Sequence, residues 1–180
     1  MPYFTVFTPT YNRGYTLYRL YESLKSQRTI DFEWMIVDDG STDMSGAICD
    51  RYTTLDARIK VIHKQNEGLG FARNTGLEVA QGKFVTFIDS DDMFIDIYSL
   101  ETLLKNIKNN DIICGNVYYE NYDNTIVTIS NDFSFQLHGK LYKRKYVDEN
   151  KFQFNDSRNG EDNCFNRLLK KQYGRGSYIM

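Results

Sequence analysis

The chain has 180 residues, 41% of them hydrophobic and 26% charged, so it is long and apolar enough to fold around a substantial core as one domain. The formal net charge of −2 argues against a dedicated nucleic-acid binder. No run of about 18 apolar residues could span a bilayer, and the first residues read as a strand and not as a signal peptide. Only peripheral contact with a membrane is therefore expected.

Strands and helices alternate through the first half of the chain. Apolar and β-branched runs indicate strands, and apolar residues at helical spacing indicate amphipathic helices. The pattern predicts strands over residues 3–8, 32–37, 58–63 and 84–88, and helices over 15–27, 71–80 and from a cap at Ser41 or Thr42 to about residue 52. This alternation implies a parallel α/β sheet.

The second half breaks that rhythm. A helix is predicted over residues 97–108, two strands over 111–119 and 125–129, and a further helix over 161–172. The basic residues between 140 and 145 are typical of a solvated face. The expected fold class is therefore α/β, with a Rossmann-like sheet that is mixed but mostly parallel and is flanked by helices.

Three cysteines, Cys49, Cys114 and Cys164, lie far apart and show no metal-binding spacing. Their spacing argues against zinc and favours reduced thiols in a cytoplasmic protein.

Carboxylates follow the buried strand that ends at Ile88. Asp89 and Asp91 are two residues apart and can face one cation, and Asp92 comes next. Clustered carboxylates repel one another, and a divalent metal that prefers oxygen ligands relieves that repulsion. The alternative interpretation is a charged turn after a strand.

Two other strands also end in polar loops, one over residues 8–12 and one over 38–41. In an open α/β sheet these ends lie on one edge, where ligands bind. Tyr11 could stack on a base, an aspartate of the second loop could accept a pyrimidine N–H, and the Asp89 cluster could hold a metal on phosphates. This inventory suits a nucleoside diphosphate.

The motifs together resemble family 2 of the inverting glycosyltransferases, which have the GT-A fold. Four motifs occur in the family's order: Thr8-Pro9-Thr10-Tyr11-Asn12, Val37-Asp38-Asp39-Gly40-Ser41-Thr42-Asp43, Asn66-Glu67-Gly68 leading to Ala72-Arg73-Asn74-Thr75-Gly76, and Asp89-Ser90-Asp91-Asp92. Two later segments also match, at 139–144 and at Gly160-Glu161-Asp162. The match covers the chain from Tyr3 to about Leu169.

The resemblance implies roles for particular residues. The residues that it implies contact the nucleotide are Pro9, Tyr11, Asp38, Asp39, Arg73 and Asp89. Asp89 and Asp91 form the DxD motif, with Asp91 as the direct ligand of Mn²⁺ or Mg²⁺ and Asp89 nearer the ribose. Glu161 and Asp162 supply the general base, with Asp162 favoured.

The implied reaction moves a sugar from a nucleotide-diphosphate sugar, with a UDP-sugar favoured, to an acceptor hydroxyl with inversion. The resemblance also implies a glycan or lipid-linked acceptor, a role in cell-surface polysaccharide or glycolipid synthesis, and a cytoplasmic location that includes the inner face of the membrane. It assigns binding of the donor to residues 1–95 and binding of the acceptor to residues 96–180. It also implies further helices after Met180.

Several alternatives stay open. Tyr11 could pack under its loop, Arg73 could pair with Glu78, and the Glu161–Asp162 pair could complement a helix dipole. His138 is a lone histidine and a weaker candidate for contact with substrate or metal. The chain as a whole could bind a nucleotide sugar without turnover. A phosphohydrolase with Asp89 as nucleophile is disfavoured, because Met93 stands where that class has Thr or Val.

Overall fold

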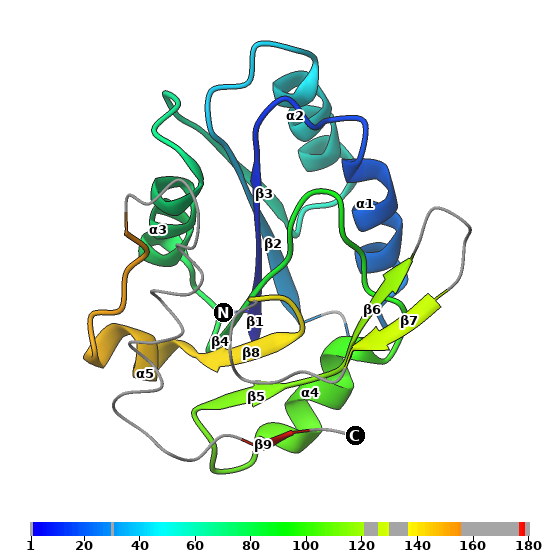
Figure 1. Ribbon diagram of the computed structural model, residues 1–180. Coiled ribbons are helices and arrows are strands. Elements are labelled where there is room, and N and C mark those ends of the chain that lie inside the picture. The colour runs from blue at the N-terminus through cyan, green and yellow to red at the C-terminus, as the bar shows by residue number, and fades with distance from the viewer. Residues whose placement is uncertain (1, 30, 121–125, 130–136, 156–176, 179–180) are drawn as a thin grey trace.

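A mixed α/β architecture is seen in the computed structural model, which describes residues 2–29, 31–120, 126–129, 137–155 and 177–178 (Figure 1). The strands in these ranges are β1 (Phe4–Thr10), β2 (Phe32–Asp38), β3 (Ile59–His63), β4 (Phe84–Phe87), β5 (Ile112–Cys114), β6 (Val117–Glu120), β7 (Ile126–Ile129), β8 (Lys140–Lys143) and β9 (Ser177–Tyr178). The helices are α1 (Leu17–Lys25), α2 (Ser45–Leu55), α3 (Leu69–Val79), α4 (Ser99–Ile107) and α5 (Arg144–Glu149).

Seven of the described strands form one sheet in the order β3-β2-β1-β4-β8-β5-β9, and β6 pairs with β7 in a separate ribbon. Strands β1 to β4 are mutually parallel, whereas β8 runs antiparallel to both of its neighbours. This arrangement confirms the predicted mixed, mostly parallel sheet. The chain moves outward from β1 to β2 and β3 and then returns to β4 on the other side of β1. The carboxyl ends of β1 and β4 therefore form the switch point at which α/β sheets bind ligands.

Side chains alternate between two apolar layers on either side of the sheet. Phe4 and Val6 of β1 pack with α1, α2 and α4, whereas Phe7 packs with α3 and α5 on the opposite face (Figure 1). Both faces are covered, so β1 and β2 are buried throughout their length. Trp34 lies in the first layer, and its indole N–H donates to Thr8 Oγ1 over 2.9 Å.

The structure corrects three local predictions. Helix α2 begins at Ser45, because Ser41 Oγ instead accepts a hydrogen bond from the backbone N–H of Asn12. The predicted strand 111–119 is split at Gly115, whose N–H donates to the carbonyl of Gly139 over 2.7 Å. Lys140 is buried and not part of a solvated face. The helix predicted over 161–172 lies outside the described residues.

The described helices are short relative to a membrane. None of them is long and apolar enough to cross a bilayer.

Gly76 lets α3 approach β1 closely. A Cβ atom at this position would lie 2.0 Å from the ring of Phe7. We expect Gly76→Ala to lower the free energy of unfolding by about 1–3 kcal/mol, because a packed core cannot absorb the added methyl group without strain. Urea denaturation measures this loss. Glu78→Ala, on the exposed side of the same helix, is the matched control and should change stability little. Equal stability of the Gly76→Ala variant and the parent would contradict the packing described.

Candidate active site

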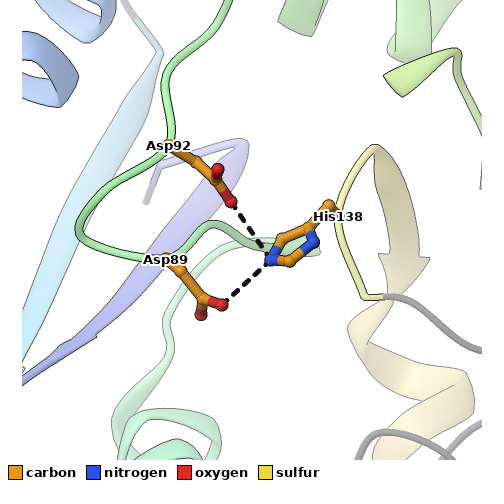
Figure 2. Close-up of side chains that lie close together, drawn as sticks. All are labelled: Asp89, Asp92 and His138. Atoms are coloured by element: carbon orange, nitrogen blue, oxygen red, sulfur yellow. Dashed lines mark hydrogen bonds and ion pairs between the residues drawn. The ribbon is translucent and has the colours of Figure 1, made fainter. Parts of the chain in front are cut away.

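The loop after β4 holds an acidic cluster that contacts an arginine and a histidine from distant parts of the chain. Arg73 of α3 donates from Nη2 to Asp89 Oδ1 over 3.0 Å. His138 Nε2 lies 3.0 Å from Asp89 Oδ2 and 3.1 Å from Asp92 Oδ2 (Figure 2). The imidazole therefore lies between two carboxylates that are three residues apart.

The surroundings of the cluster shift the pKa values of Asp89 and Asp92 in opposite directions. Burial alone would raise the pKa of Asp89, but the hydrogen bond from His138 and the charge of Arg73 outweigh it and hold that pKa at about 2. Burial raises the pKa of Asp92, and the charges of Asp89 and Asp91 add to this increase. Arg73 is only 1% exposed. Its pairing with Asp89 excludes the alternative in which Arg73 is a surface residue paired with Glu78.

These side chains have the composition and spacing of a metal site. One ligand atom each from Asp89, Asp92 and His138 all lie within 4.8 Å of one another. Two carboxylates and an imidazole suit Mn²⁺ well, whereas Mg²⁺ prefers oxygen ligands alone. The sequence indicated Asp89 but left Asp92 and His138 as secondary candidates, because His138 lies 49 residues from Asp89 and has no local motif.

Asp91, the metal ligand favoured by the sequence, has a different partner in this structure. Arg13 Nη1 donates to Asp91 Oδ2 over 2.6 Å, and both side chains are 50% exposed. Arg13 belongs to the loop after β1, so this ion pair joins the first and third of the predicted binding loops. The role of Asp91 as a metal ligand stays a prediction.

The first loop is tied closely to the second. Asn12, whose φ is +53°, accepts the backbone N–H of Thr42 on its side-chain oxygen over 2.8 Å. Pro9 lies inside β1, beyond Phe7, the last residue of β1 paired with β4. The missing N–H of proline is tolerated because β1 is bordered by β2 alone at that point. Tyr11 is 47% exposed, which leaves part of its side chain accessible to a ligand.

Asp39 is a buried carboxylate at the end of the second strand. Its oxygens accept the backbone N–H groups of Glu67 and Gly68 and the ammonium group of Lys64, over 3.1, 2.8 and 3.1 Å. Its own N–H donates to the carbonyl of Thr10 over 2.9 Å. Asp39 thus fixes the loop before α3 against the ends of β1 and β2.

Asp38, its neighbour, is also buried and contacts a histidine. Its Oδ1 accepts the N–H of Ser41 over 3.0 Å, and its Oδ2 lies 2.9 Å from His63 Nδ1. The other ring nitrogen of His63 lies 3.0 Å from Asp50 of α2. His63 therefore bridges two carboxylates and restrains the loop that carries Asp38 and Asp39.

A cleft of about 710 Å³ opens beside the acidic cluster. Its walls come from the end of β4, the start of α4 and the loop between β5 and β6, with His138 and both Asp91 and Asp92 among its lining residues. Tyr11, Asp39 and Arg73 are not among them. The cleft thus lies on the α4 side of the acidic loop.

The predicted general base falls outside the described part of the chain. Glu161 and Asp162 both belong to the range 156–176, so their role stays a prediction.

Comparison with known proteins identifies the family. The family model described as glycosyl transferase family 2 matches residues 5–168. The chain belongs to glycosyl transferase family 2. GlyG of Streptococcus pneumoniae serotype 4 (strain ATCC BAA-334 / TIGR4), named a glycosyltransferase, is 40% identical over 122 residues, which cover 66% of this chain and 40% of GlyG.

Solved structures of the same architecture agree with this assignment. Residues 1–349 of S. aureus TarS, crystallised with UDP-GlcNAc, match with a TM-score of 0.85 and 26% identity over 99% of this chain and 56% of that chain. The mannosyltransferase PcManGT from Pyrobaculum calidifontis, in complex with GDP-Man and Mn²⁺, matches with a TM-score of 0.81, covers 99% of this chain and 55% of that chain, and at 18% identity shares the fold alone. This family 2 chain spans less than half of GlyG and little more than half of the TarS segment.

We predict that His63 contributes more stability when it is protonated than when it is neutral. Hydrogen bonds to Asp50 and Asp38 raise the pKa of His63 above its ordinary value of 6.5. A raised folded-state pKa gives stability that is fully present below about pH 6.5 and is lost as the pH rises through the folded-state value. His63→Asn should therefore cost more stability at pH 6 than at pH 9. The difference should stay below about 1 kcal/mol, since the ring is partly solvated.

Urea denaturation of the parent and of His63→Asn at the two pH values measures this difference. His138→Asn is not a suitable control because it alters the acidic cluster, so Lys145→Gln, at an exposed site on α5, is used instead. An equal cost of His63→Asn at pH 6 and pH 9 would contradict the proposed bridge.

Proposed function

We propose that this family 2 chain transfers a sugar from a nucleotide-diphosphate sugar to an acceptor hydroxyl, with inversion at the anomeric carbon. The observation that carries the proposal is the cluster of Asp89, Asp92 and His138, with Arg73 beside it, at the switch point of the sheet. That position is where an α/β sheet binds a nucleotide, and that composition is what a divalent cation requires.

One comparison supports a UDP-sugar as donor, and one buried group at the end of β1 is consistent with a bound ligand of any kind. The similar TarS structures contain UDP-GlcNAc and UDP. The hydroxyl of Thr10, at the end of β1, is buried and has no hydrogen-bond partner among the described residues. A buried hydroxyl without a partner is costly, and a bound ligand is one way to satisfy it. The transferred group is then a hexose or an N-acetylhexosamine.

Asp89, Asp92 and His138 would hold the cofactor, Mn²⁺ or Mg²⁺, with Asp91 as the ligand that the family motif predicts. When bound, such a cation stabilises the negative charge that develops on the leaving nucleoside diphosphate. Loss of the proton from His138 Nε2 would expose a lone pair at the point that both carboxylates face. The nitrogen ligand favours Mn²⁺.

The protein's own residues would bind the donor and activate the acceptor. Pro9, Tyr11, Asp38 and Asp39 belong to the two connected loops that we assign to the nucleoside, and Arg73 holds Asp89 in place. Asp162, with Glu161, would remove the proton of the acceptor hydroxyl, a step that contributes about 10²–10⁴-fold to such reactions. Attack opposite the leaving group then inverts the configuration, and no covalent intermediate is needed.

The proposal extends to the acceptor and the setting. We infer a glycan or lipid-linked acceptor used in cell-surface polysaccharide or glycolipid synthesis, and a reaction in the cytoplasm at the inner face of the membrane. The division into a donor half over residues 1–95 and an acceptor half over 96–180 belongs to the same proposal.

A thermal-shift panel of nucleoside diphosphates and their sugars, with and without Mn²⁺, tests the donor class. We expect UDP and one UDP-sugar to raise the melting temperature only when Mn²⁺ is present, since a ligand that binds the folded state stabilises it by mass action. ADP with Mn²⁺ is the control for binding of any diphosphate. If no nucleotide of the panel gave a metal-dependent shift in melting temperature, the proposal would be contradicted.

Turnover is tested separately from binding. We expect Asp162→Asn to lower the rate of sugar transfer, or of slow donor hydrolysis, by about 10²-fold or more while donor affinity is retained. The measurement is release of UDP from the donor identified in the panel. Tight donor binding with no turnover in the parent chain would favour the alternative, a nucleotide-sugar-binding module.

A further inference from the structure

The three carboxylates after β4 each contact a basic side chain in the described part of the molecule. Arg73 pairs with Asp89, His138 contacts Asp89 and Asp92, and Arg13 pairs with Asp91. A divalent cation that enters this cluster must therefore compete with charges that the chain already supplies.

Of these basic side chains, Arg13 is the one that can leave its carboxylate most easily. Arg73 is 1% exposed and its guanidinium also lies over the ring of Phe154, at 5.4 Å. The His138 side chain is 25% exposed, whereas that of Arg13 is 50% exposed. An exposed ion pair is held by about 0–1 kcal/mol, so Arg13 can leave Asp91 at little cost.

The backbone that carries Arg13 is firmly held even though its side chain is exposed. On one side, the N–H of Asn12 donates to Ser41 Oγ over 2.9 Å, and on the other the N–H of Gly14 donates to Ser45 Oγ over 2.7 Å. The carbonyl of Arg13 accepts the N–H of Thr16 over 3.0 Å. The guanidinium therefore starts from a fixed point on the β1 side of the switch point and reaches the loop after β4.

We propose that Arg13 exchanges partners during donor binding: it pairs with Asp91 in the metal-free chain and with the donor's diphosphate once a cation occupies the acidic cluster. The inference rests on the proposed function, because it requires a diphosphate ligand and a metal that Asp91 helps to hold. A guanidinium matches phosphate oxygens with two parallel hydrogen bonds, and it lies next to the carboxylates that would hold the metal. Arg13 would then be a positioning residue that links metal binding to donor binding.

The exchange predicts effects of opposite sign at the two binding steps. Without nucleotide, Arg13 competes with the cation for Asp91, so its removal should tighten metal binding. With the cation present, Arg13 contributes hydrogen bonds to the diphosphate, so its removal should weaken nucleotide binding. A residue that only supports the loop would weaken both.

The experiment measures both affinities on the full chain. Free Mn²⁺ is titrated by its electron paramagnetic resonance signal without nucleotide, and UDP is titrated by calorimetry at a fixed, saturating Mn²⁺ concentration. We expect Arg13→Gln to tighten Mn²⁺ binding by about two- to fivefold and to weaken UDP binding by about tenfold or more. Arg13→Lys, which keeps the charge but loses the planar fork, should bind Mn²⁺ like the parent and UDP with intermediate affinity.

Arg51→Gln is the matched control, because it removes the same charge from an exposed site on α2. It should leave both affinities unchanged, and thermal melting checks that every variant is folded. Weakening of both affinities, or a change in neither, in a folded Arg13→Gln variant would overturn the exchange while leaving the proposed function intact. Failure of the parent chain to bind UDP or any other nucleoside diphosphate of the thermal-shift panel with Mn²⁺ would overturn the proposed function, and the exchange with it.

Discussion

The mutual repulsion of the carboxylates of Asp89, Asp91 and Asp92 is the constraint on which the rest of the site depends. The structure meets it by bringing two arginines and a histidine from three separate segments to a single loop. Arg73 reaches Asp89 because α3 packs closely on β1, with Gly76 against Phe7. His138 immediately precedes Gly139, whose carbonyl accepts the N–H of Gly115. The packing of α3 on β1 and the contact between Gly115 and Gly139 thus place basic side chains beside this loop.

The loops after β1 and β2 and the loop before α3 are joined by hydrogen bonds that are partly buried or exposed. Asp39 accepts two backbone N–H groups from the loop before α3, and Asn12 accepts one from the loop after β2. These bonds hold the loops before any ligand arrives, so a nucleotide would not have to order them. Preorganisation of this kind raises affinity by lowering the entropy lost on binding. In the proposed exchange, the exposed Arg13–Asp91 pair is the contact that changes while these hydrogen bonds are kept.

The sequence predicted the parallel half of the sheet well, because each strand and helix there has its own apolar periodicity. It failed where a distant partner decides the outcome. Ser41 does not cap α2 because its hydroxyl accepts the N–H of Asn12, and the strand predicted over 111–119 is divided because its first part pairs with β8 and its second with β7. Asp89 and Arg73 could be named from local motifs. The contacts of His138 and Arg13 could not, since they join residues 49 and 78 positions apart.

The chain has two histidines, and this allows a direct test of the metal site. Pulsed electron paramagnetic resonance of the Mn²⁺ and UDP complex detects coupling between the metal and an imidazole nitrogen. The account predicts a nitrogen coupling in the parent chain that persists in His63→Gln and disappears in His138→Gln. No nitrogen coupling in the parent, or a coupling that survives in His138→Gln, would contradict the cluster of Asp89, Asp92 and His138 as the place where the cation binds.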